Sequence, residues 1–185
     1  SAGFCSRGMG VILVGPLPTP GVSYIMRSLR ADGAVMISAS HNAYADNGIK
    51  FFAPDGFKVP DEVEADIEQL IGSEEVNAIR PTGKDIGGAR RIDDAVGRYI
   101  DFAKATVPKG MRFDGLRIVC DCANGATYKV GPNCLRELGA DVIAMGNKPD
   151  GRNINEACGS VHPEDMRARV IREKADLGVA FDGDG

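Results

Sequence analysis

The sequence predicts an α/β protein, because short apolar segments typical of buried strands alternate with amphipathic segments typical of helices. The alternation is most regular after residue 110, where strand, helix, strand, helix and strand follow one another. Strands joined through helices lie parallel with right-handed crossovers, so a parallel sheet is expected there. Because ligands bind beyond the carboxyl ends of such strands, functional residues are expected at strand ends.

The first half of the chain contains both kinds of segment, separated by glycines and prolines. Gly10 to Gly15 reads GVILVG, a short aliphatic run, and Val63, Ile67 and Leu70 recur at helical spacing. A polar, glycine-rich excursion is expected over 72–92. The expected strands are 10–15, 34–38, 49–53 and 57–59, and the expected helices are 21–31, about 60–71 and 93–106.

Val107-Pro108-Lys109-Gly110 is expected to link this half to the second. Beyond it the sequence predicts strands 116–121, 141–145 and 177–182, and helices over about 127–138 and 163–174. Gly139 is well placed to cap the first of these helices at its C-terminus. Pro163 suits an early position of the second.

Composition narrows the class of protein. The 185 residues carry a net charge of −4 with acids and bases interspersed, so neither nucleic acid nor a membrane surface is an expected partner. No apolar run approaches a membrane span, and residues 1–7 lack the features of a signal peptide. The five cysteines show no zinc-ligand spacing, which favours reduced thiols in a cytoplasmic protein.

A serine-containing loop follows the expected strand 34–38. Ser40 precedes His41 and Asn42, and Lys50 lies ten residues later, where its ammonium could return to the same pocket. Small polar residues at a strand end usually form only a turn, but the compact loop and the histidine favour a functional role. A Ser-His-Asp hydrolase is disfavoured, because no G-x-S-x-G motif is present.

Two carboxylates follow the last expected strand, in Asp182-Gly183-Asp184-Gly185. Alternate residues of extended backbone face the same side, so both carboxylates can surround one cation such as Mg²⁺. The alternative without a binding function is a solvated glycine turn. An EF-hand is disfavoured because that loop follows a helix rather than a strand. His162 is expected to cap or pack, and Asp121 and Asn124 to order a strand–helix turn.

Five segments together resemble the α-D-phosphohexomutase family, and they occur in the family's order over almost the whole chain. The segments are PLPTP (16–20), VMISASHNAYADNGIKFF (35–52), DCANGATYK (121–129), CGSVHPE (158–164) and FDGDG (181–185). The resemblance implies two three-layer α/β/α domains with mixed or mainly parallel sheets, both incomplete, over residues 1–110 and 111–185. Ala43 departs from the family, which often has proline there.

The resemblance also implies a role for each site residue. Ser40 is the serine that carries the phosphoryl group, His41 and Lys50 assist proton transfer and charge stabilisation, and Asn42 orders the loop. Asp182 and Asp184 bind Mg²⁺ together with a phosphate oxygen on Ser40. Serine is a weak nucleophile until charge is neutralised nearby, so these roles are physically consistent.

Within the family, the segments are most similar to bacterial members that interconvert glucosamine 6-phosphate and glucosamine 1-phosphate through a 1,6-bisphosphate. That reaction supplies UDP-N-acetylglucosamine and cell-wall precursors. The expected partner is thus a phosphosugar. Formation of a homodimer by the full-length protein is left as an open alternative. The family's sugar-reading and distal phosphate-binding segments are not in this sequence, so the chain alone is expected not to interconvert glucosamine phosphates.

Three other functions stay open. A phosphomannomutase/phosphoglucomutase would share the same framework, because the segments quoted above do not read the sugar. A non-catalytic α/β module that binds phosphate or a cation would show the same loops. A metal-dependent phosphatase would leave Ser40 without an evident task.

Overall fold

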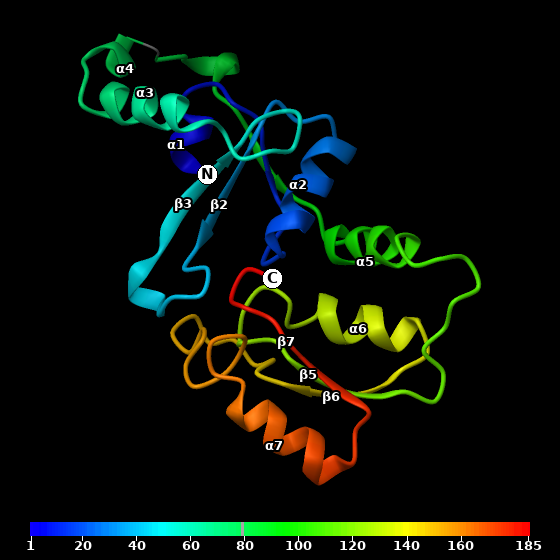
Figure 1. The fold of residues 1–185 in the computed structure, drawn as a ribbon. Coiled ribbons are helices and arrows are strands. Elements are labelled where there is room, and N and C mark those ends of the chain that lie inside the picture. The colour runs from blue at the N-terminus through cyan, green and yellow to red at the C-terminus, as the bar shows by residue number, and fades with distance from the viewer. Residues whose placement is uncertain (79) are drawn as a thin grey trace.

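The computed structural model describes residues 1–78 and 80–185, which form an α/β structure in two halves (Figure 1). The strands are β1 (Val11–Leu13), β2 (Ala34–Ser38), β3 (Gly48–Phe52), β4 (Ala89–Arg91), β5 (Arg117–Asp121), β6 (Asp141–Met145) and β7 (Leu177–Ala180). The helices are α1 (Ala2–Cys5), α2 (Thr19–Ser28), α3 (Asp61–Ile71), α4 (Glu75–Ala78), α5 (Ala95–Ala105), α6 (Val130–Glu137) and α7 (Glu164–Glu173). None of these described helices is long and apolar enough to cross a membrane.

The second half is a parallel sheet in the order β6-β5-β7, with helices α6 and α7 on opposite faces (Figure 1). The central strand β5 is almost wholly buried, as expected for a parallel strand covered on both faces. Gly139 adopts a φ of +110° directly after α6 and ends that helix, and Pro163 directly precedes α7. The predicted strand–helix alternation and the α/β fold class are confirmed.

The first half contains two separate two-stranded sheets, a parallel pair β1-β4 and an antiparallel pair β2-β3. The segment 72–92, expected to be a polar excursion, also contains strand β4, which pairs with β1. The expected strand 57–59 is reduced to a single bridge between Phe52 and Lys58. The turn at 54–56 is present, with the Gly56 amide bonded to the Ala53 carbonyl.

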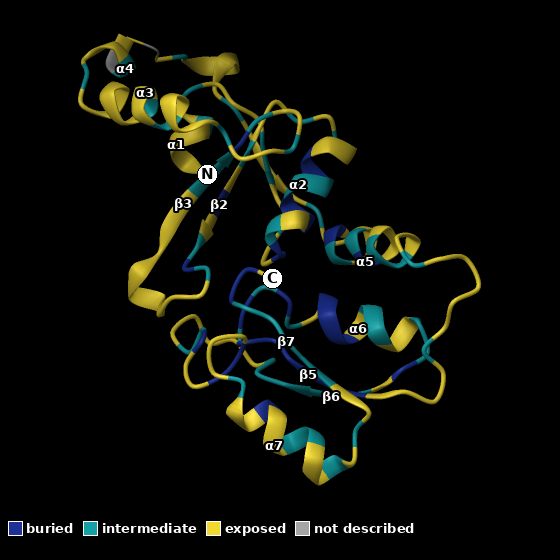
Figure 2. Cartoon of the chain, viewed as in Figure 1, coloured by how far each residue is buried: buried dark blue, intermediate teal, exposed yellow. Residues whose placement is uncertain are grey.

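The main apolar core lies between helices α2 and α5 and extends to α6, so it joins the two halves. Ala95, Leu17 and Ile25 are its most buried members, and Val130 of α6 packs with them. Figure 2 shows these buried segments meeting beside the C-terminus. Helix α2 begins two residues earlier than predicted, because proline is tolerated in the first turn of a helix.

Two apolar surfaces of the first half are exposed. Helix α3 lies where the periodicity predicts, yet it has no buried residue and its Ile71 is 77% exposed. The β2-β3 ribbon likewise exposes Ile37 and Ile49, which are cross-strand partners, on one face. The opposite face of the ribbon carries Ser38 and Lys50 and turns toward the second half.

Candidate active site

The Ser40 loop, residues 39–47, connects two antiparallel strands, and the register of those strands determines which side chains accompany it. Ser38 pairs with Gly48 and Met36 pairs with Lys50. Cross-strand partners share a face, and residues two apart on a strand share a face. Ser38, Met36 and Lys50 therefore lie on the same side of the ribbon, and Lys50 is brought back beside the loop although ten residues separate it from Ser40.

Residues 181–185, the acidic loop, follow strand β7 at the carboxyl edge of the parallel sheet. Gly183 and Asp184 are buried and Asp182 is half-buried. The Asp184 carbonyl accepts a 2.8 Å hydrogen bond from the backbone N–H of Thr19, at the start of α2. The Asp182 carboxylate accepts a 2.8 Å bond from the Gly185 N–H. The first bond fixes the loop against the first half of the chain, and the second closes the loop on itself.

The two loops meet at the Ser40 hydroxyl. Ser40 Oγ lies 3.5 Å from Asp182 Oδ2 and 3.4 Å from Asp184 Oδ1. A hydroxyl donates one hydrogen, so it can satisfy only one of these carboxylates at a time. The Asp184 carboxylate also accepts a hydrogen bond from Ser38 Oγ at 3.2 Å and forms an ion pair with Lys50 Nζ. One serine thus faces two carboxylates with a lysine beside them.

The surroundings of Asp184 favour its ionised form. Burial of the carboxyl opposes ionisation, but hydrogen bonds from Lys50, Thr19 and Ser38 and the positive charge of Lys50 outweigh that effect. The pKa of Asp184 therefore lies below its ordinary value of 3.8. An anionic carboxylate next to a serine oxygen is suited to bind a cation as well as a proton donor.

Asp182 and Asp184 supply oxygen ligands of the kind Mg²⁺ prefers, each within 3.5 Å of one hydroxyl. No group of three or more His, Cys, Asp or Glu side chains in the described part of the chain is arranged to hold a metal. Mg²⁺ commonly binds through one or two carboxylates plus phosphate oxygens and water. The two carboxylates and a phosphorylated Ser40 fit that pattern.

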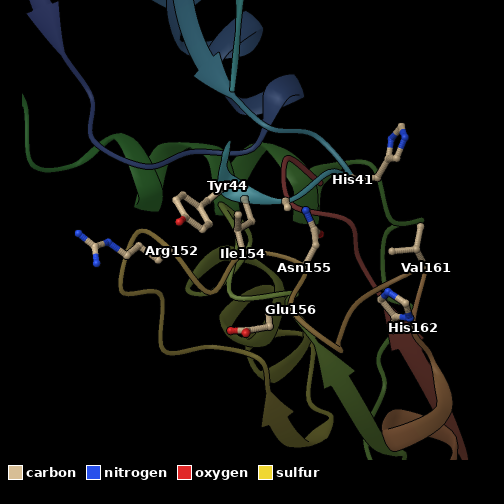
Figure 3. Close-up of a pocket in the computed structure, with 9 residues that line it drawn as sticks. His41, Tyr44, Arg152, Ile154, Asn155, Glu156, Val161 and His162 are labelled. Carbon is tan, nitrogen blue, oxygen red and sulfur yellow. The ribbon is translucent and has the colours of Figure 1, made fainter. Parts of the chain in front are cut away.

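The remaining predicted site residues, His41 and Asn42, make other contacts. His41 is exposed and is one of the residues that line a pocket of about 260 Å³, whose other walls include Asn155 and His162 of the second half (Figure 3). His162, expected to cap or pack, lines the same pocket. Asn42 contributes its backbone carbonyl, which accepts a hydrogen bond from Asn155.

Two buried residues order the site, and only one of them, Asp121, is predicted from the sequence. Asp121 is completely buried, and its carboxylate accepts backbone bonds from Ala123 at 3.0 Å and Gly159 at 2.8 Å, as expected for a residue that orders a turn. The other, Asn155, is not among the predicted site residues, yet its side-chain amide donates hydrogen bonds to the carbonyls of Ser40 and Asn42. No local pattern marks it, because its partners lie more than a hundred positions earlier.

Comparison with known proteins agrees with this geometry. Residues 1–78 match the description "Phosphoglucomutase/phosphomannomutase, alpha/beta/alpha domain I", and residues 97–185 match the corresponding description for domain II. The chain therefore belongs to the phosphoglucomutase/phosphomannomutase family, the α-D-phosphohexomutases, as the sequence motifs predict.

Curated relatives include the phosphoglucosamine mutase of Citrifermentans bemidjiense, 59% identical over 99% of this chain and 40% of the relative. That of Anaeromyxobacter dehalogenans is 56% identical over 100% of this chain and 42% of the relative. A phosphoglucomutase/phosphomannomutase family protein from Burkholderia thailandensis has a similar structure, with a TM-score of 0.71, 26% identity, and coverage of 97% of this chain and 39% of that chain. The chain thus spans about 40% of the length of these relatives.

Proposed function

We propose that the chain forms the phosphoserine-bearing and metal-binding part of a phosphoglucosamine mutase. The observation that carries this proposal is the approach of Ser40 Oγ to within 3.5 Å of two carboxylates from the other half of the chain. The names of the relatives, which are 55–59% identical over nearly the whole chain, support the choice of glucosamine phosphates as substrates.

In the proposed reaction, phosphorylated Ser40 gives its phosphoryl group to glucosamine 6-phosphate: the bond from Ser40 Oγ to phosphorus breaks, and one from the sugar O1 forms. The 1,6-bisphosphate then returns its 6-phosphoryl group to Ser40 and leaves as glucosamine 1-phosphate. Mg²⁺ held by Asp182 and Asp184 would neutralise negative charge on the transferred group. Lys50, paired with Asp184, adds a positive charge at the same place. His41 and Asn42 are proposed to assist proton transfer and to order the loop.

The proposal includes two domains, residues 1–110 and 111–185. In support of this boundary, Gly110 has a φ of +88° in the segment between α5 and β5, and every strand of the three-stranded parallel sheet comes after it. Contacts between α5 and α6 and between the two loops cross this boundary, so we expect the domains to pack together. We also propose a cytoplasmic location, because all five cysteines are free in the structure, as a reducing compartment requires.

A chimera tests the proposed function. Residues 1–185 replace the matching segment of the Citrifermentans bemidjiense phosphoglucosamine mutase, and formation of glucosamine 1-phosphate is followed in a coupled assay. Activity that disappears with Ser40→Ala supports the proposal, and a folded but inactive chimera contradicts it. Comparison of glucosamine, mannose and glucose phosphates distinguishes the sibling enzymes. The isolated chain is expected to show no turnover, and Ser40-dependent turnover by it would refute that expectation.

A further inference from the structure

We propose that Asn155 is a positioning residue that holds the Ser40 loop in the geometry needed for phosphoryl transfer. The catalytic importance of Asn155 rests on the proposed function, whereas its restraint of the Ser40 loop rests on hydrogen bonds within this chain. Asn155 belongs to the second half, and the atoms it binds belong to the first. It therefore ties the nucleophile of one half to the framework that carries the two carboxylates.

The contacts of Asn155 are made through one nitrogen. Its Nδ2 donates to the carbonyl oxygen of Ser40 at 2.9 Å and to that of Asn42 at 2.7 Å, which uses both amide hydrogens. The Ser40 carbonyl also accepts the backbone N–H of Gly183 at 3.1 Å. The second half thus supplies all three of these donors to the backbone of the Ser40 loop.

Asn155 is itself fixed to the end of the central strand. Its backbone N–H donates to the Ala123 carbonyl at 2.8 Å, and the Asp121 carboxylate orders the same turn through the N–H groups of Ala123 and Gly159. Its φ of +57° lies in the left-handed region, which asparagine tolerates better than most residues. The residue is 7% exposed, so its side chain cannot swing freely into solvent.

Ser40 needs such a restraint because its own backbone is strained. Its φ is +52°, in the left-handed region that is unfavourable for a residue with a Cβ. Loss of the two Asn155 bonds would let the loop relax toward extended conformations. The hydroxyl would then leave the position 3.5 Å and 3.4 Å from Asp182 and Asp184.

A role in packing alone does not account for an asparagine here. Its Oδ1 is buried and has no hydrogen-bond partner in the described part of the chain. A buried polar atom without a partner costs free energy, which an apolar residue of similar size would avoid. The side chain contributes through its two N–H groups, and both point at the Ser40 loop.

Hydrogen exchange in the 185-residue chain tests the positioning directly. Asn155→Asp keeps the shape but removes the donors, and Asn155→Ala removes them without adding charge. We expect exchange at the amides of Ser40 and Asn42 to accelerate by about tenfold or more in both variants. Protection of strand β5 should be unchanged. The matched control is Asn153→Ala, because the side-chain bonds that Asn153 makes with other described residues go to Lys148 and Asp150 of its own loop.

Kinetics in the chimera described above give the second readout. A positioning role predicts that Asn155→Asp lowers kcat about tenfold or more while KM for the sugar phosphate stays within about twofold. If the unsubstituted chimera is inactive, the proposed function fails, and the exchange measurement still decides the positioning role.

Three results would overturn the inference. One is unchanged exchange at Ser40 and Asn42 in both Asn155 variants. Another is equal acceleration in Asn153→Ala. The third is loss of protection throughout the chain in both Asn155 variants, which would make Asn155 a residue of general stability.

Discussion

Replacement of Gly183 with alanine is expected to push the acidic loop away from the Ser40 loop. A Cβ added at Gly183 would overlap the carbonyl oxygen of Ser40 and would lie 2.6 Å from Ile154 Cδ1 and 2.9 Å from Asn155 Nδ2. The first contact is with backbone, which cannot move aside as the end of a flexible side chain can. Gly183 does not have a positive φ, so the expected effect comes from crowding rather than from backbone strain.

The magnitude follows from two contributions. Overpacking of a tightly packed site costs about 1–3 kcal/mol. Loss of the hydrogen bond from the Gly183 N–H to the Ser40 carbonyl costs about 0.5–1.5 kcal/mol. The free energy of unfolding should therefore fall by roughly 2–4 kcal/mol, and at about 2–4 °C per kcal/mol the melting temperature should fall by roughly 5–15 °C.

Thermal and urea unfolding, followed by circular dichroism, measure this change. Gly97→Ala is the matched control, because Gly97 lies within helix α5 and a Cβ there would meet no atom within 4 Å. The control should gain about 0.5–1 kcal/mol, since alanine is the better helix former. A Gly183→Ala chain as stable as the unsubstituted one would refute the close contact between the two loops.

Three further outcomes are expected. Lys50→Met should lower the free energy of unfolding by about 1–2 kcal/mol in urea titrations, because Asp184 loses its partner; an unchanged midpoint would argue against that ion pair. Asp182→Asn and Asp184→Asn should each weaken binding of Mn²⁺ as a Mg²⁺ substitute, measured by electron paramagnetic resonance, and equal affinity in all chains would contradict the cation site. Cys120 and Cys122, both fully buried, should react with a thiol reagent only at the rate of unfolding; fast reaction in the native chain would contradict their burial.

The sequence predicts the second half of the fold well, because its signals are local and strong. Aliphatic strands, amphipathic helices and the right-handed crossover rule together imply the parallel sheet. Strand β4 was missed because Ala89-Arg90-Arg91 is short and wholly exposed, and lacks the apolar signal of a buried strand. The location of α3 was predicted, but periodicity could not reveal that its apolar face is exposed.

The candidate site was predictable where it depends on strand ends and less so where it depends on contacts between loops. Ser40 and the two carboxylates follow strands, so their positions could be anticipated, and the return of Lys50 follows from the register of β2 and β3. Asn155 could not be identified, because its importance arises from a contact across 115 positions of the chain. His41 shows the converse: its neighbour Ser40 contacts the carboxylates, while His41 lines a separate pocket, a difference that adjacency in sequence does not reveal.

The central claim is that Ser40 carries the phosphoryl group. The most direct measurement incubates the chimera with glucose 1,6-bisphosphate and Mg²⁺ and maps the modified peptide by mass spectrometry. We predict one phosphoryl group on Ser40, which disappears when glucosamine 1-phosphate is added in excess. An active chimera whose Ser40 never becomes phosphorylated would contradict the account.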